Sequence, residues 1–280
     1  MIQGQPEPGT DQAWSWDPSL YAGSAKYYAV GRVAYPPQLV EALQLDGSGV
    51  LLDVGCGPGS LTLLLAPHVG EAIGVDADAE MLSEASQLAI LQQVPNVTWR
   101  HLRGEDFPAD LPRPRLVTFA QSFHWMDRPR VAAAVRRMLV TDGALVHVGA
   151  TTHQGIDSDT QLPYPRPPRQ AIDQLVRRYL GPQRRAGQSI LAAGTSGDED
   201  DVYRAVGFEG PERHEVPGRV VERTAGQVVA SVYSLSYSAP HLFGDRLPAF
   251  DEQLRQLLAD ASDEGRFAEQ MRSITLSIWR

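Results

Sequence analysis

One stretch, residues 50–66, constrains the fold of this chain more than any other. Its first five residues are mostly apolar and branched, which predicts a short buried strand of a parallel sheet. A glycine-rich turn follows, and residues 60–66 have the composition of a helix with Ser60 or a neighbour as its N-cap. This order predicts a nucleotide pocket, because glycines let a ligand approach the backbone and a helix N-terminus offers free N–H groups.

The spacing of the glycines indicates which kind of nucleotide is bound. Gly55, Gly57 and Gly59 form the pattern G-x-G-x-G, whereas a dinucleotide site has G-x-G-x-x-G. Ser60 stands where the third glycine of a dinucleotide site would be. The pattern therefore argues against a nicotinamide oxidoreductase. A glycine turn that binds nothing is the other alternative.

Two carboxylates frame the turn. Asp53 lies two residues before the first glycine, a position that suits a ligand with a cationic amine better than a pyrophosphate. A second predicted strand, residues 72–75, ends at Asp76, which is placed to accept hydrogen bonds from ribose hydroxyls. D-x-G-x-G-x-G followed by I-G-V-D resembles the class I S-adenosylmethionine-dependent methyltransferases, and within them a bacterial, type 11-like subgroup that acts on small molecules.

The resemblance implies the fold class and the domain organisation. The implied fold is an α/β, Rossmann-like doubly wound sheet of seven strands, with the last strand antiparallel, an N-terminal helical lid and an inserted substrate lid after strand five. The remaining strands are predicted at residues 97–102, 116–121, 144–148, 212–216 and 273–279. The predicted domains are an N-terminal arm and lid helix (1–35), the cofactor-binding core (36–150), the inserted lid (151–200) and a C-terminal part that completes sheet and lid (201–280).

The resemblance also implies the cofactor-binding positions. Tyr28-x-x-x-Arg32 resembles the segment that closes over the cofactor, and the fixed fork of donors on Arg32 suits the cofactor carboxylate. Arg103 stands where an adenine-binding acid is common, which leaves backbone contact from Gly104 and Glu105. For Tyr28 and Met81 the alternative is ordinary packing in helices, and for Glu105 the alternative is a cap on the following turn. The predicted set is Tyr28, Arg32, Asp53, Gly55, Cys56, Gly57, Gly59, Asp76, Ala77, Met81, Gly104, Glu105 and Gln121.

The predicted reaction needs few catalytic side chains. Methyl transfer from a sulfonium is an in-line displacement, for which the protein mainly supplies proximity and alignment. A general base is needed only where the acceptor is protonated. His124, just after the strand at 116–121, is the candidate base, and the alternative is that it only walls the pocket with Trp125. No cluster of His, Cys or acidic residues has the spacing of a metal site, so no metal is expected.

Composition narrows the function class and the setting. The formal net charge of −9 argues against a general nucleic-acid binder, which needs a basic face. The single cysteine, Cys56, excludes an internal disulfide, and we interpret it as a small residue of the turn rather than a catalytic thiol. Neither a membrane-spanning run nor a signal peptide is visible. These features predict a cytoplasmic monomer or homodimer without nucleic-acid or membrane partners.

The predicted function is transfer of a methyl group from S-adenosyl-L-methionine to an O, N or C atom of a small-molecule metabolite, with S-adenosyl-L-homocysteine as the product. A bacterial enzyme of secondary metabolism fits the subgroup that the sequence resembles. An RNA or protein methyltransferase, and a non-catalytic module that binds the cofactor, are the alternatives. The acceptor, its reacting atom and the use of a base stay open from the sequence.

Overall fold

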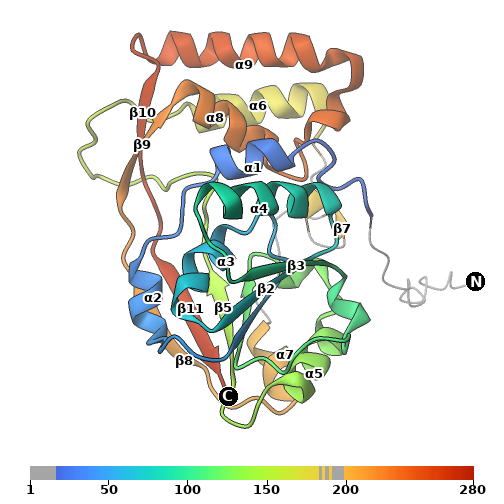
Figure 1. Cartoon of the computed structure of the whole chain (residues 1–280). Coiled ribbons are helices and arrows are strands. Elements are labelled where there is room, and N and C mark those ends of the chain that lie inside the picture. Colours follow the sequence, from blue (N-terminus) through green and yellow to red (C-terminus); the bar gives the residue numbers. More distant parts are fainter. Residues whose placement is uncertain (1–16, 183–184, 187–188, 191–198) are drawn as a thin grey trace, which may run out of the picture.

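A seven-stranded sheet in the order β3-β2-β1-β4-β5-β11-β8 forms the centre of the protein (Figure 1). The computed structural model describes residues 17–182, 185–186, 189–190 and 199–280. The strands of the sheet are β1 (Val50–Val54), β2 (Glu71–Asp76), β3 (Val97–His101), β4 (Leu116–Ala120), β5 (Ala144–Gly149), β8 (Glu212–Val216) and β11 (Ile274–Trp279). β1 to β5 run parallel, and β11 is antiparallel to both of its neighbours. The predicted fold class is confirmed.

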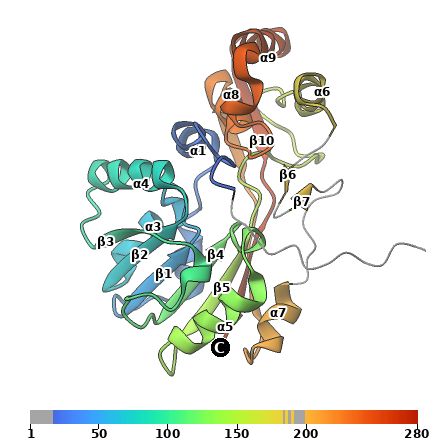
Figure 2. The ribbon, with the colours of Figure 1, turned by 90° about the vertical axis from the view of Figure 1, so that its right-hand side faces the viewer.

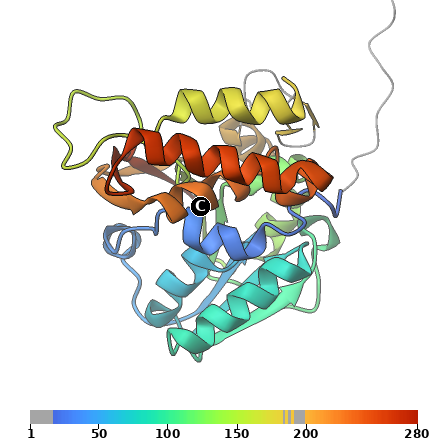
Figure 3. The same cartoon turned by 90° about the horizontal axis from the view of Figure 1, so that it is seen from above.

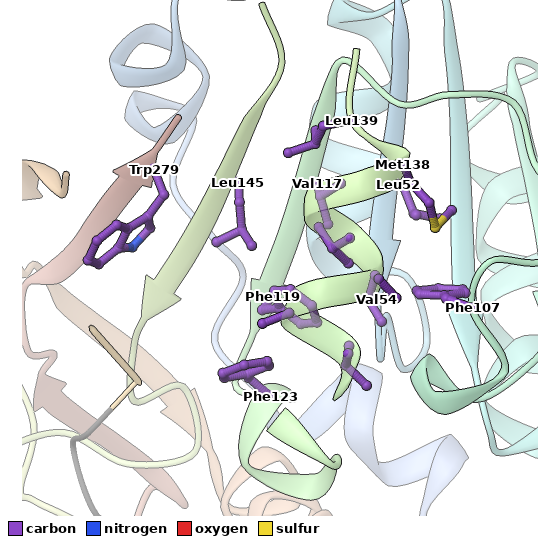
Figure 4. Close-up of a cluster of buried hydrophobic side chains, with 14 of the residues drawn as sticks. Leu52, Val54, Phe107, Val117, Phe119, Phe123, Met138, Leu139, Leu145 and Trp279 are labelled. Atoms are coloured by element: carbon purple, nitrogen blue, oxygen red, sulfur yellow. The ribbon is translucent and has the colours of Figure 1, made fainter. Parts of the chain in front are cut away.

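The central strands are buried on both faces, which explains their nearly continuous apolar sequences. On one face they pack against α5 (Arg128–Met138) and α7 (Glu199–Ala205). On the other face they pack against α2 (Gln38–Leu43) and α3 (Ser60–Leu65), while α4 (Ala79–Leu91) lies on β2 and β3. Figure 4 shows the first of these cores, where the rings of Phe119 and Phe123 lie 4.8 Å apart.

A second layer of helices, here called the cap, lies above the sheet in Figure 1. It consists of α6 (Arg169–Leu180), α8 (Ala225–Tyr233), α9 (Leu247–Ala261) and a ribbon of β9 (Val220–Thr224) with β10 (Arg266–Gln270). The cap helices share their own apolar core. The N-terminal helix α1 (Ala25–Gly31) lies between α8 and α4 in both side views and in the view from above (Figures 1, 2 and 3). It therefore sits between the cap and the sheet layer.

The structure adds two details to the sequence predictions. Gly59, in the left-handed conformation, is the N-cap of α3, and Ser60 is the first helical residue, so of the predicted alternatives it is the neighbour of Ser60 that caps the helix. The β9–β10 ribbon was not predicted, because it pairs segments about forty residues apart. Residues 1–16 of the predicted N-terminal arm, and residues 183–184, 187–188 and 191–198 of the predicted insertion, lie outside the described residues.

Among the described residues, none of the helices is both long and apolar enough to cross a bilayer. These residues also contain no group of three or more His, Cys, Asp or Glu side chains arranged to hold a metal ion.

Candidate active site

The glycine turn after β1 is tied directly to β2. The backbone N–H groups of Gly55 and Cys56 donate to the carbonyl of Val75 at 2.8 and 3.0 Å. Gly55 has a φ of +69°, and a Cβ atom there would lie 2.4 Å from the Ser122 side chain. Only glycine satisfies both conditions, because it tolerates a positive φ and leaves room for the neighbouring segment. The turn therefore stays open at the carboxyl ends of β1 and β2, where open α/β sheets bind ligands.

Asp76, at the end of β2, is held by two backbone donors. Its carboxylate accepts hydrogen bonds from the N–H of Gly57 at 2.8 Å and from the N–H of Asp78 at 2.9 Å. Burial raises the pKa of the Asp76 carboxyl to about 6, although both hydrogen bonds favour its charged form. The side chain also lines the cleft described below. An oriented carboxylate in this place can accept hydrogen bonds from a pair of ribose hydroxyls.

Asp53, on β1, is a buried carboxylate with two hydroxyl partners. Its side chain accepts hydrogen bonds from Thr62 at 2.6 Å and Thr118 at 2.7 Å, and the residue is 1% exposed. Burial raises the pKa of the Asp53 carboxyl, because water no longer stabilises its charge. No cation of the described part of the chain forms an ion pair with it. A ligand amine would supply the missing counter-charge.

Two adjoining cavities form one cleft across the glycine turn. The first encloses about 660 Å³, a volume that includes space open to solvent. The second opens between α1, α3 and α4. The cavities share Tyr28, Gly55, Gly57 and Ala120 among their lining residues. The cleft is therefore long enough to hold a ligand with two separate polar ends.

The first cavity contains most of the residues that the sequence predicts around the adenosine. Besides Asp76, its lining includes Ala77, Met81, Gly104 and Glu105, as the sequence predicts. Glu105 is 3% exposed, and its carboxylate accepts the N–H of Asp127 at 2.7 Å. The Glu105 side chain therefore fixes the segment that leads into α5 rather than the turn that follows Glu105, and the residue also lines the cavity.

The second cavity contains Arg32 and a polar group around it. The Arg32 guanidinium donates to the side chain and the carbonyl of Ser234, both at 2.9 Å, and to the Thr152 hydroxyl at 3.5 Å. It also lies 4.3 Å from the ring centre of Tyr28, a cation–π contact. A guanidinium has five N–H donors, so donors of Arg32 stay available for an anionic ligand group.

Gln121 lies at the wall between the two cavities. Its backbone has a φ of +57° at the end of β4, a conformation that is uncommon outside glycine and often found at functional sites. Its side-chain amide donates to the Tyr35 hydroxyl at 3.2 Å and to the Thr152 hydroxyl at 3.3 Å. This network joins the N-terminal segment, β4 and the segment after β5.

The cleft brings together all the predicted cofactor-binding residues except Gly59. Gly59 packs under Trp99 instead, and a Cβ atom there would lie 2.5 Å from the indole. His124 is half-buried in the turn Phe123–Trp125 and is not among the residues that line either cavity. Burial, with a smaller effect of His147, lowers the pKa of His124 to about 4, so the imidazole is neutral at neutral pH. Its role as a base stays a prediction.

Sequence reasoning did not assign several residues of the cleft. Tyr21 lines the first cavity and makes edge-to-face contacts with Tyr28, at 6.4 Å, and Trp125, at 5.8 Å between ring centres. The signal for Tyr21 in the sequence is an aromatic segment before the first strand, which contains Trp14, Trp16, Tyr21, Tyr27 and Tyr28. Thr152 had no sequence signal, because only the course of the chain after β5 brings it to the cleft.

The sheet order, the antiparallel β11 and the cleft at the glycine turn define a Rossmann-like protein with a ligand site at the carboxyl ends of its strands. Residues 51–143 match the model of the family described as methyltransferase domain. The matched segment is about a third of the chain, and it supports an assignment to the class I S-adenosylmethionine-dependent methyltransferases.

Several curated relatives are methyltransferases. An uncharacterized methyltransferase of Mycobacterium tuberculosis is 34% identical over 130 residues, which are 46% of this chain and 51% of that protein. The trans-aconitate 2-methyltransferase of an Azoarcus species is 34% identical over 87 residues, 30% of this chain and 31% of that protein. A tRNA (uracil-5-)-methyltransferase homolog of Mus musculus is 38% identical over 66 residues, 24% of this chain and 11% of that protein. The chain thus spans about half the length of the mycobacterial relative and less of the other two.

Solved structures share the fold at low sequence identity. The YcgJ protein of Bacillus subtilis aligns with a TM-score of 0.50 and 17% identity, covering 86% of this chain and 95% of that one. The [4+2]-cyclase SpnF aligns with a TM-score of 0.50 and 15% identity, covering 94% and 97%. These similarities concern the fold alone.

Proposed function

We propose that this chain transfers the methyl group of S-adenosylmethionine to an O, N or C atom of a small molecule. The observation that carries the proposal is the division of polar groups between the two cavities. Asp76 lines the first, and Asp53 and Arg32 line the second. Their chemistry matches the ribose hydroxyls of this cofactor in the first cavity, and its amine and carboxylate in the second.

In this proposal the first cavity holds the adenosine and the second holds the amino-acid end of the cofactor. Asp76 would accept the ribose hydroxyls, and Met81 would pack on the adenine. Asp53 would face the amine, and Arg32 would donate to the carboxylate. The bound cofactor supplies an activated methyl group, so the contribution of the chain is to orient both reactants and exclude water.

A small acceptor is the proposal that the cap favours. α1 contributes Tyr28 to the lining of the cleft and packs against α8 of the cap, and Tyr21 and Trp125 line the first cavity. Residues 151–200 with the C-terminal part would form the acceptor lid. The net charge of −9 disfavours a polyanionic substrate. The trans-aconitate relative acts on a small molecule, whereas the tRNA relative shares only a short segment. We propose a cytoplasmic bacterial enzyme, monomeric or homodimeric, and secondary metabolism as its setting.

A non-catalytic or differently acting cofactor-binding protein is the second candidate. The [4+2]-cyclase SpnF shares the fold of this chain, so the fold alone does not decide between the two candidates. Turnover of the cofactor separates the two candidates, since only a methyltransferase converts S-adenosylmethionine to S-adenosylhomocysteine stoichiometrically with a methylated product.

The first test is a titration of the purified chain with S-adenosylmethionine and, separately, with NADH. We expect binding of S-adenosylmethionine in the micromolar range, about 8 kcal/mol, and no binding of NADH. A methyl-labelled cofactor is then incubated with pooled small metabolites and, in parallel, with RNA and protein. Label that enters small molecules supports the proposal. Label in RNA or protein alone, or a folded chain that binds neither ligand, contradicts it.

A further inference from the structure

A buried ionic cluster of Arg169, Arg223 and Glu269, here called the arginine cluster, lies at the base of the cap. Arg169 begins α6, Arg223 lies on β9 and Glu269 on β10. Glu269 accepts two hydrogen bonds from Arg169, at 3.0 and 2.7 Å, and one from Arg223 at 3.3 Å. The side chains of Arg223 and Glu269 are 3% and 5% exposed. Two guanidiniums against one carboxylate leave the cluster with a net positive charge.

The arginine cluster forms hydrogen bonds with the backbone of two segments that border the cleft, the end of α1 and the segment after β5. Arg223 donates to the carbonyl of Gly31, the last residue of α1, and to the carbonyl of His153 at 2.9 Å. Arg169 donates to the same His153 carbonyl at 3.1 Å. Glu269 accepts the N–H of Gly155 at 3.0 Å. The cluster thereby fixes the end of α1 and the segment after β5 relative to each other.

The two fixed carbonyls flank side chains that line the cleft. Arg32 follows Gly31, and Thr152 precedes His153. These two segments also pair directly, since the N–H of Val33 donates to the Thr152 carbonyl at 2.7 Å. The charge of Arg32 is close enough to contribute to the lowered pKa of Arg223, whose main cause is burial. This end of the cleft therefore combines a fixed geometry with an excess of positive charge.

We propose that Arg223 is a positioning residue for the cofactor: by holding the carbonyls of Gly31 and His153, it places Arg32 and Thr152 to receive the cofactor carboxylate. This inference rests on the proposed function and adds to it a role for the cap in cofactor binding. The acceptor cap and the carboxylate end of the cofactor site are then coupled, because β9 and β10 belong to the cap and Arg223 acts on the cleft.

If the arginine cluster only stabilised the cap, its disruption would not act selectively on the binding of one end of the ligand. Two adenosine ligands separate these roles. S-Adenosylhomocysteine carries the amino-acid end, whereas methylthioadenosine has the adenosine and the sulfur but no carboxylate. A defect in the position of Arg32 must lower the affinity for S-adenosylhomocysteine and leave the affinity for methylthioadenosine unchanged. A general loss of structure lowers both affinities.

The experiment compares Arg223→Lys with the unchanged chain by titration calorimetry. Lysine keeps the charge but cannot reach several carbonyls as a fork. We expect the affinity for S-adenosylhomocysteine to fall about ten-fold or more, the size of one charge-assisted hydrogen bond, and that for methylthioadenosine to stay within about two-fold. Arg166→Lys is the matched control, because Arg166 also donates to carbonyls of the cap region, those of Ile156 and Ser158, but lines no part of the cleft. It should leave both affinities unchanged.

Glu269→Gln provides a second variant if Arg223→Lys does not fold. The amide keeps the size of the carboxylate but releases both arginines from their ion pairs, so the same selective loss is expected. Equal losses for both ligands in these variants, or no loss for either, overturn the positioning role. If the unchanged chain binds neither ligand, the proposed function itself fails, which distinguishes the two results.

Discussion

Replacement of Asp76 by Asn tests the ribose assignment most directly. The carboxylate already accepts the N–H groups of Gly57 and Asp78, one on each oxygen, and would accept ribose hydroxyls in addition. An amide has one oxygen instead of two and carries no charge. Each hydrogen bond to a charged group contributes about 1.5–3 kcal/mol. At 1.4 kcal/mol per factor of ten, the loss of one such bond weakens S-adenosylmethionine about 10- to 100-fold at pH 8.

The pH dependence gives the same prediction a second readout. The pKa of the Asp76 carboxyl is about 6 before the ligand binds. Below this pH, the carboxyl of the unchanged chain must lose a proton before it can accept the ribose hydroxyls as a carboxylate. Between pH 8 and pH 5.5 the affinity should fall about four-fold, since only about a quarter of the carboxyl is then ionised. In Asp76→Asn this dependence should be absent.

The raised pKa of Asp76 also predicts how the folding stability of the ligand-free chain depends on pH. Raising the pKa of a carboxyl from 3.8 to about 6 corresponds to roughly 3 kcal/mol. That contribution is fully present below the unfolded value of 3.8 and is lost as the pH rises through about 6. At neutral pH Asp76 therefore destabilises the ligand-free fold, and the pKa of about 6 already includes the opposing effect of its two N–H partners.

Calorimetric titration of S-adenosylmethionine at pH 8 and pH 5.5 checks both parts of the Asp76 prediction. Asp78→Asn is the matched control, because it removes the same charge two residues away. Asn preserves the N-cap that Asp78 forms at α4, so the control should bind within about two-fold of the unchanged chain. The reasoning is refuted if Asp76→Asn binds as tightly as the control or keeps the pH dependence.

Three further substitutions test other parts of the structure. If His124 is the base, His124→Ala lowers turnover by a factor on the order of 10²–10⁴ with unchanged cofactor affinity, whereas a small, pH-independent effect in steady-state kinetics assigns it to the wall. Gly31→Ala places a Cβ atom 2.3 Å from the Ala230 carbonyl carbon, so it should separate α1 from α8 and lower the melting temperature by several degrees; an unchanged melting curve would contradict this packing. Asp53→Asn removes a buried charge whose pKa is raised, so the ligand-free chain should melt higher at pH 7 while S-adenosylmethionine binds about ten-fold more weakly; tighter binding would exclude the amine contact.

α1 connects these predictions, because it is bonded more extensively to the cap than to the sheet layer. The Ser24 hydroxyl donates to the Tyr233 carbonyl at 2.8 Å, and Arg32, at the end of α1, donates to Ser234. Toward α4, the segment before α1 has a hydrogen bond from the N–H of Gly23 to Glu80 at 3.1 Å, which is exposed to solvent. Perturbations of the cap are therefore expected to reach the cofactor through Tyr28 and Arg32.

The sequence alone determined the strand, glycine turn and helix and the two carboxylates that frame the turn. These features are local: strand propensity, positive φ and the position of an acid at a strand end depend on neighbouring residues. For the same reason the cofactor class and most of the first cavity could be predicted from short motifs. The central strands β1, β2 and β4 were also predictable, because strands buried on both faces are nearly continuous apolar runs.

Only the tertiary structure decided the other half of the site. The partners of Arg32, Thr152 and Ser234, each lie more than a hundred residues away from it in the sequence. No local sequence pattern encodes their approach. The structure also excluded His124 from the lining of the cleft, because the turn after β4 directs neighbouring side chains differently. The arginine cluster likewise exists only after the cap has folded. Burial makes the ionic contacts of Arg223 and Glu269 strong, and burial is a property of the packed chain rather than of its sequence.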